Sequence, residues 1–432
     1  MQAPTSRAHS SISPAARRYA MVVLAVVYMF NFIDRQILSI LLPAIRDEFQ
    51  VGDAVLGLLA GTAFALFYVT LGVPIAQLAD RVNRRNLIAI AVAVWSGMTA
   101  LSGLSATFWQ LALARIGVGI GEAGCSPPAH SMIADYYPPE KRSSAMGFYT
   151  LGISTGVMLA YLAGGWVAEN IGWREAFLIV GVPGLFLALI LRFTVIEPQR
   201  GASEQRLDSG RKPRLRVVMR FLLVRRSFLY MAVAAGLSAF VGYSVINFFP
   251  SFMVRSFAVD VATLGLWLGL IYGIAGGLGF FMGGYIADHV GRTGHRKALW
   301  FIAAAVLITA SFNFAVYLAP TAVWCLLLSI IPAVTSNFYL APVLSQTQSL
   351  VSLRMRAVAS SLVLLIINLI GLAMGPPITG IVSDLLEPGY GSESMRYSLL
   401  LVSSVLLPLA AWCYFQAGKS IEHDLRRADE HD

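Results

Sequence analysis

The stretch "YAMVVLAVVYMFNFIDRQILSILLPAI" (residues 19–45) is long and apolar enough to cross a bilayer, yet it carries an acid and a base side by side, Asp34 and Arg35. A helix needs about 20 mainly apolar residues to cross about 30 Å of hydrocarbon. An ionised side chain at that depth costs about 2.5–3.5 kcal/mol even on the mild insertion scale, so such a residue indicates a function. The stretch therefore predicts a membrane-spanning helix whose charges face protein or a cavity.

The composition supports the same class of protein. The chain has 432 residues, of which 57% are hydrophobic and only 13% charged, whereas a soluble domain carries about 25% charged residues. The polar start of the chain runs directly into a hydrophobic stretch of spanning length, which is not the pattern of a cleavable signal. We expect a polytopic membrane protein.

Hydropathy windows of spanning length predict an all-α integral membrane protein with twelve transmembrane helices in two six-helix halves. The predicted spans are 18–43, 55–79, 86–105, 108–133, 144–168 and 175–195 in the first half, and 226–250, 260–287, 297–318, 320–343, 357–382 and 395–417 in the second.

One long polar interruption separates the halves. It predicts a cytoplasmic linker at 197–225 between bundles at 18–196 and 226–417, with cytoplasmic tails at 1–17 and 418–432. Two like-oriented halves of six spans are the parallel-repeat plan of a large transporter class.

Basic residues are distributed unevenly between the two sides of the membrane. If both termini are cytoplasmic, 25 of the 32 Lys and Arg lie inside, and the outer loops hold only Arg46, Arg174, Arg255 and Arg396. This bias predicts that both termini are cytoplasmic, and we expect the protein in the bacterial inner membrane. The net charge of +9 then reflects basic residues that face anionic membrane lipids. We therefore expect no nucleic acid partner.

A short charged loop recurs in both halves. "AQLADRVNRR" (76–85) follows the second predicted span, and "GYIADHVGR" (284–292) follows the eighth. Acids and bases at a helix end can latch neighbouring helices, which predicts a cytoplasmic gate, although short loops often collect such residues. The candidate gating residues are Asp80, Arg81, Arg84, Arg85, Asp288 and Arg292.

The charges predicted to lie deep in the membrane all belong to the first half: Asp34, Arg35, Arg115 and Glu122. Buried charges need partners, and we expect Asp34 to pair with Arg115. Glu122 is the predicted proton carrier, because a poorly hydrated carboxyl favours its neutral form, and Arg115 would switch it to the charged form. The alternative is a fixed ion pair between Arg115 and Glu122 that only joins helices.

Polar residues within the spans suggest a substrate site. Adjacent positions on a helix point about 100° apart, so only one of Asp34 and Arg35 should face a cavity. Asn31 lies one turn before Asp34 and could bond it, and the asparagines of the second half either line the cavity or join helices. The candidate substrate-binding residues are Asn31, Arg35, Arg115, Tyr243, Asn247, Asn337 and Asn368.

Four stretches carry a resemblance to a known family. They are "NFIDRQ" (31–36), "GVPIAQLADRVNRR" (72–85), "ARIGVGIGEAGCSPPAHSMIADYYPPEKR" (114–142) and "GWREAF" (172–177). With these the chain resembles the major facilitator superfamily and, within it, the Spinster-like branch. The first half matches closely, and the second matches mainly in hydropathy and in the repeated Asp loop. The resemblance implies a monomeric secondary transporter, and animal members are linked to sphingolipid-type and lysophospholipid cargo.

We therefore expect a proton-coupled transporter that works by alternating access on an amphiphilic, lipid-like substrate. The first alternative is proton-coupled transport of small organic anions such as sugar acids. A non-transporting sensor or scaffold is a different class. An enzyme acting on lipid is the least supported, because the chain has no nucleophile constellation. The sequence also lacks a nucleotide P-loop and a metal-ligand cluster, so no cofactor or metal is expected and uphill transport would use an ion gradient.

Overall fold

The computed structural model describes residues 12–79, 81–200, 215–291, 294–352 and 355–429, and within these ranges every regular element is a helix. The first half contains α1 (Pro14–Phe49), α2 (Asp53–Gly57), η1 (Leu58–Thr62), α3 (Ala63–Ala79), α4 (Arg84–Gly103), α5 (Phe108–Glu122), α6 (Ser126–Tyr136), α7 (Pro139–Asn170) and α8 (Trp173–Thr194). A short helix, α9 (Leu215–Leu223), lies within the predicted linker.

The second half contains α10 (Arg226–Phe257), α11 (Val261–Leu268), η2 (Gly269–Ala275), α12 (Gly276–Gly291), α13 (His295–Tyr317), α14 (Ala322–Thr335), α15 (Leu340–Ser349), α16 (Arg356–Ile366), η4 (Ile367–Ala373), α17 (Gly375–Tyr390), η5 (Gly391–Glu393) and α18 (Ser394–Asp429). The segments η1, η2 and η4 are single π-helical stretches within longer helices. Such bulges occur often at functional sites.

Ten helical runs in the described part of the chain are long and apolar enough to cross a membrane. Two features reconcile this number with the twelve predicted spans. The predicted span 108–133 is broken into α5 and α6, each too short to be counted alone. The run from Val358 to Arg426 includes both α16–α17 and α18, which turn back on each other at η5.

The first helix of each half ends in the same way. The residues after α1 and α10, Gln50 and Ala258, both adopt the left-handed conformation with φ of 50° and 52°. Few non-glycine residues adopt it, so its occurrence at equivalent positions supports the repeat. Beyond the predicted bounds, α1 already begins at Pro14, capped by Ser13, and α18 continues to Asp429.

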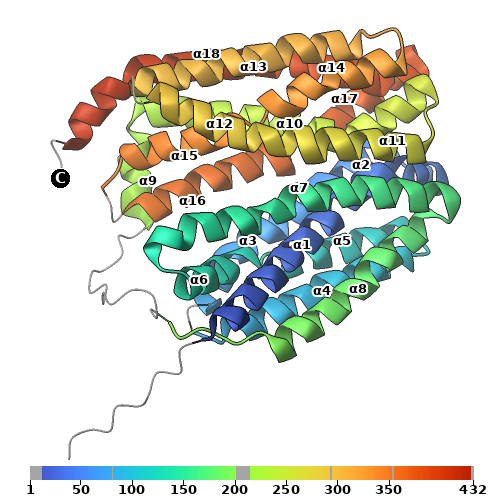
Figure 1. Ribbon diagram of the computed structural model, residues 1–432. Coiled ribbons are helices and arrows are strands. Elements are labelled where there is room, and N and C mark those ends of the chain that lie inside the picture. The colour runs from blue at the N-terminus through green and yellow to red at the C-terminus, as the bar shows by residue number, and fades with distance from the viewer. Residues whose placement is uncertain (1–11, 80, 201–214, 292–293, 353–354, 430–432) are drawn as a thin grey trace, which may run out of the picture.

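The two halves form separate bundles that are joined at one end. Figure 1 shows α1–α8 and α10–α18 as two layers, with α7 beside α11. Each half has its own apolar core, around Trp95 in the first and Tyr414 in the second. A third core is shared: Ile45 and Tyr161 of the first half lie in one cluster with Phe252 of the second. This shared core holds the halves together near the C-terminal end of α1.

Candidate functional site

A cavity of about 390 Å³ lies between the two halves, within the range of small-molecule sites. The first half contributes Tyr28, Phe32, Arg35 and Gln36 from α1. Most of the remaining wall comes from apolar and aromatic side chains of the second half. Among the described residues that line it, Arg35 is the only charged one.

Arg35 is held by an ion pair with Glu122 of α5. Its Nη2 donates to Glu122 Oε2 at 2.6 Å, and its Nε donates to the same oxygen at 3.2 Å. The Arg35 side chain is 14% exposed and that of Glu122 is fully buried. Glu122 therefore lies behind Arg35, with no direct place in the cavity wall.

A break in the fourth span positions Glu122. Helix α5 ends at this residue, the chain turns through 123–125, and α6 begins at Ser126 with prolines in its first turn. The glycines of α5 allow close packing: a β-carbon at Gly119 would lie 2.7 Å from the Phe64 carbonyl oxygen, and one at Gly121 would lie 2.7 Å from the Trp95 nitrogen. The carboxyl thus sits at a helix end enclosed by α3 and α4.

Three aromatic rings surround the Arg35 guanidinium. Its central carbon lies 4.7 Å from the centre of the Phe64 ring, 5.1 Å from that of Tyr68 and 5.3 Å from that of Phe32. Aromatic faces attract a cation at this range. Together with the Glu122 carboxylate they hold the guanidinium at the cavity wall.

The structure pairs the in-membrane charges differently from the sequence prediction. Arg115 Nη1 donates to the backbone oxygen of Asp34 at 3.2 Å, and Glu122 takes Arg35 as its partner. Helix rotation explains the difference: Asp34 points about 100° away from Arg35 on α1, toward Thr99 and Trp95 of α4. The Asp34 carboxyl is fully buried there, with no hydrogen bond of normal geometry to a described residue.

Three of the seven candidate substrate-binding residues lie off the cavity. Arg115 and Asn31 are buried, and Asn31 lies beside the Glu122 carboxyl, so it does not bond Asp34 as expected. Asn247 instead joins the two halves: its side-chain oxygen accepts from Ser39 Oγ at 2.9 Å, and its amide nitrogen donates to the Tyr243 carbonyl.

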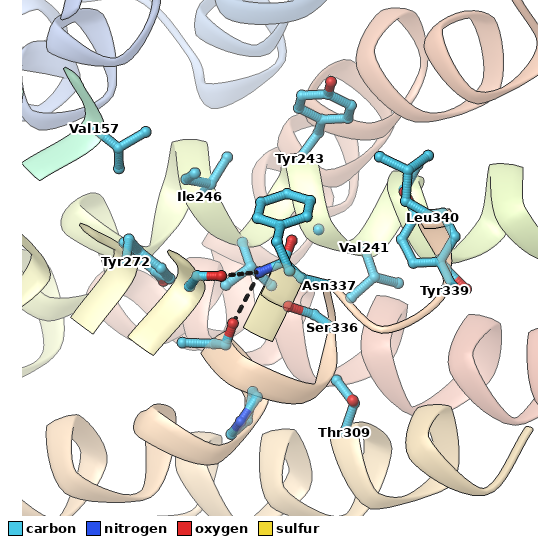
Figure 2. A pocket seen from close by; sticks show the side chains of 18 of the residues that line it. Val157, Val241, Tyr243, Ile246, Tyr272, Thr309, Ser336, Asn337, Tyr339 and Leu340 are labelled. Atoms are coloured by element: carbon cyan, nitrogen blue, oxygen red, sulfur yellow. Dashed lines mark hydrogen bonds between the residues drawn. The ribbon is translucent and has the colours of Figure 1, made fainter. Parts of the chain in front are cut away.

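The other four candidates, Arg35, Tyr243, Asn337 and Asn368, line the cavity. Figure 2 shows Asn337 between Tyr272 and Tyr339, with Tyr243 on the opposite side from Thr309. Asn337 lies in the turn between α14 and α15, the second-half counterpart of the break at Glu122. Sequence reasoning missed several polar lining residues, because short polar side chains in apolar spans give no signal of the direction in which they point. These are Gln36, Ser154, Ser238, Thr309, Asn313, Ser329 and Ser336.

A charged cluster, here called the closed-end cluster, joins the halves where they meet. It consists of Arg46, Asp53, Arg255, Ser383, Asp384 and Glu387. Arg255 of α10 donates to the buried Asp53 carboxylate at 2.6 Å, and Ser383 of α17 donates to the same oxygen at 2.7 Å.

A second set of contacts completes the closed-end cluster. The Asp384 carboxylate accepts from the backbone nitrogens of Asp53 and Ala54 at 2.8 and 2.9 Å, which caps α2 from the other half. Arg46 of α1 donates to Glu387 at 2.7 Å. The sequence prediction placed Arg46 and Arg255 in loops and assigned them no role.

The predicted gating loops are only partly described. Asp80 and Arg292 lie outside the described residues, as does the side chain of Asp288. Arg84 is 2% exposed at its side chain and binds Asp135 of α6 and Glu197 of the linker. Arg85 donates from its backbone nitrogen to Glu197, and Arg81 is exposed. Arg84 and Arg85 thus anchor the start of the linker to the first half, and the gate itself stays a prediction.

The sequence of residues 24–376 matches the Major Facilitator Superfamily. The chain is 31% identical over 447 residues to protein spinster homolog 1 of Bos taurus, covering 95% of this chain and 82% of that protein. The chain belongs to this superfamily, as a transporter of the Spinster type. These matches confirm the expected fold class, an all-helical multi-pass membrane protein, and exclude the enzyme alternative.

Other relatives of this Spinster-type transporter carry different functional names. It is 30% identical over 426 residues to an MFS-type efflux pump of Mycolicibacterium smegmatis, covering 98% of both chains. A hexuronate transporter of Bacillus subtilis is 26% identical over 298 residues, covering 68% of this chain and 70% of that one.

One solved structure matches nearly the whole of the Spinster-type fold. It is a bacterial homologue of the human lysosomal transporter Spinster in an inward-facing, unoccupied conformation, with a TM-score of 0.89 and 32% identity over 96% of this chain and 99% of that one. The closed-end cluster lies at the end of α1 and α10 opposite the start of α1 and the end of α18.

Proposed function

We propose that this Spinster-type transporter moves an amphiphilic anion by alternating access, together with a proton carried by Glu122. The protein would work as a monomer in the bacterial inner membrane, and the distribution of Lys and Arg supports placing both termini in the cytoplasm.

The Arg35–Glu122 ion pair is the observation that carries the proposal. Arg35 is the only charged side chain among the described residues of the cavity wall, and Glu122 neutralises it from behind. A substrate anion that binds Arg35 competes with the Glu122 carboxylate. A buried carboxylate without its partner has a high free energy, and taking up a proton removes this cost. Anion binding and protonation of Glu122 therefore support each other.

The rest of the cavity favours an amphiphile. The second-half wall includes Tyr243, Phe249 and Tyr272, together with aliphatic side chains. An apolar chain buried there gains about 25 cal/mol for each Å² removed from water. A polar anionic head at Arg35 with a hydrocarbon part along these rings uses both features.

Small organic anions such as sugar acids are the second candidate. The hexuronate transporter named above is a relative, and a lone cation with polar neighbours also suits a carboxylate. This candidate predicts that hydroxyl groups, and no hydrocarbon chain, fill the aromatic part of the cavity.

Transport into proteoliposomes distinguishes the candidates. The assay compares a labelled lysophospholipid or sphingoid phosphate with a labelled sugar acid under an imposed pH gradient, in wild type and in Glu122→Gln. We expect gradient-driven amphiphile flux that Glu122→Gln abolishes. Flux of the sugar acid alone would establish the second candidate, and flux indifferent to the gradient would refute proton coupling.

A further inference from the structure

Four polar side chains on the second-half wall of the cavity use protons in hydrogen bonds within the protein. They are Thr309, Ser329, Asn337 and Asn368. Asn337 Nδ2 donates to the carbonyl oxygens of Ala333 at 3.0 Å and Gly276 at 3.4 Å, and Asn368 Nδ2 donates to that of Leu364 at 2.8 Å. A carbonyl oxygen only accepts, so these contacts fix which end of each amide faces the helix.

The two hydroxyl groups behave in the same way. Ser329 donates to the Leu326 carbonyl at 2.7 Å. The Thr309 and Thr335 hydroxyls lie 2.6 Å apart, with the Ala305 and Ile331 carbonyls as their other acceptors. Each hydroxyl has one proton, so both protons of the threonine pair are used within the pair and its own helices.

These bonds use the nitrogen end of each amide and leave its oxygen as the end that can accept from a substrate. The side-chain oxygen of Asn337 lies on the side of the amide away from the two carbonyls that its nitrogen binds (Figure 2). Asn313 is buried in the same wall, and its amide can offer either end. No described residue of the second half that lines the cavity carries a charge, so this wall offers amide oxygens as acceptors, beside the hydroxyl groups of Tyr243, Tyr272 and Tyr339, and no fixed cation.

We propose that the second-half wall selects substrates carrying a hydrogen-bond-donating group, a hydroxyl or an ammonium, in addition to the anion at Arg35. The inference rests on the proposed function for the anion and adds a second recognition point. A substrate without donors would cover Asn337 Oδ1 and Asn368 Oδ1 and leave both unpaired, which sites built to hydrogen-bond reject strongly.

Equilibrium binding to the purified full-length transporter tests this inference without any gradient. The probes are hexyl, nonyl and dodecyl phosphate, each alone and with a hydroxyl or an amino group at the far end of the chain. In wild type we expect the donor-bearing probe of the best-fitting length to bind about tenfold more tightly than its parent, as one or two hydrogen bonds provide. A larger gain for the amine or for the alcohol identifies which donor the wall prefers.

Matched variants separate recognition from folding. Asn337→Leu and, separately, Asn368→Leu should reduce the advantage of the donor-bearing probe while binding the parent as wild type does. Asn170→Leu is the control, because Asn170 makes the same bond to its own helix, to the Trp166 carbonyl at 2.8 Å, at an exposed position. Equal binding of parent and donor-bearing probes to wild type would overturn this inference alone. Loss of binding of all phosphates in Arg35→Gln would still support the anion site, and no phosphate binding to wild type would overturn both.

Discussion

Arg35 lies at the cavity wall and Glu122 directly behind it, with 2.6 Å between Nη2 and Oε2, while the neighbouring Asp34 points to a different helix. Although Asp34 and Arg35 are adjacent on α1, Arg35 therefore faces the cavity and Asp34 faces α4. The ion pair is neutral as a whole, yet its cation is accessible and its anion is not. An arriving anion meets Arg35 first, and its binding to Arg35 weakens the ion pair with Glu122.

Arg35→Lys should weaken anion binding although it keeps the charge. Arg35 donates to Glu122 from two nitrogens and lies among three aromatic rings, and a lysine ammonium lacks both the two-nitrogen fork and the flat face that stacks on rings. We expect about 10- to 100-fold weaker binding of an alkyl phosphate, measured by calorimetry. Arg192→Lys, at an exposed position in α8, should bind as wild type does. Unchanged affinity in Arg35→Lys would mean that only the net charge matters.

Asp53→Asn should loosen the closed end of the transporter. The Asp53 carboxylate is fully buried and is held from the other half by Arg255 and Ser383, and the loss of one partner of a buried charge pair typically costs about 3–5 kcal/mol. Part of that loss should appear as a larger population of molecules open at this end. Distances between spin labels on the ends of α1 and α10 would report it.

The control for Asp53→Asn is Glu393→Gln. Glu393 pairs with Arg396 at the same end of the molecule, at 2.7 Å, but both residues belong to the second half. This variant should leave the label distances unchanged. An equal change of the label distances in both variants would show that any loss of charge at this end opens it. That result would contradict a specific role of Asp53 in holding the halves together.

Gly165→Leu should prevent the halves from meeting. A β-carbon at Gly165 of α7 would lie 2.6 Å from the Val261 carbonyl oxygen and 3.0 Å from the Gly265 α-carbon of α11. A leucine cannot fit there while the closed end stays closed, so we expect greater labelling of cysteines introduced near this end and loss of transport. Gly147→Leu on the same helix, where a β-carbon meets nothing within 4 Å, should label as wild type does.

Arg84→Gln should destabilise the first half. The Arg84 side chain binds Asp135 and Glu197 and also donates to Ser131 and the Pro198 carbonyl. Removing this buried cation takes an ion pair from both Asp135 and Glu197, with a loss of about 3–5 kcal/mol of stability, and the melting temperature in detergent should fall by several degrees. The exposed Arg81→Gln should melt as wild type does; a similar fall for both would contradict the assigned anchoring role.

The sequence was sufficient for the spans but insufficient for the pairings. Hydropathy locates a span because about 20 apolar residues in a row must find hydrocarbon, and Glu122 and Arg35 stand out there because charges are rare. Which charge meets which depends on the rotation of α1 and on the break after Glu122. Neither the rotation of α1 nor the position of this break can be read from a hydropathy window.

Contacts between distant segments were also beyond sequence reasoning. Asp384 and Asp53 are 331 positions apart, and their contact exists only because the halves meet at one end. Asn337 could be named as a candidate from its polarity within a span, but the direction of its amide follows from the turn between α14 and α15.

Proton uptake on anion binding is the most direct test of the central claim. The purified transporter in a weakly buffered solution with a pH indicator would be titrated with an alkyl phosphate whose own ionisation is subtracted, at a pH where Glu122 is ionised in the free protein. We predict uptake of up to about one proton for each anion bound by wild type, and none in Glu122→Gln. Binding without proton uptake in wild type, or equal uptake in Glu122→Gln, would contradict the account.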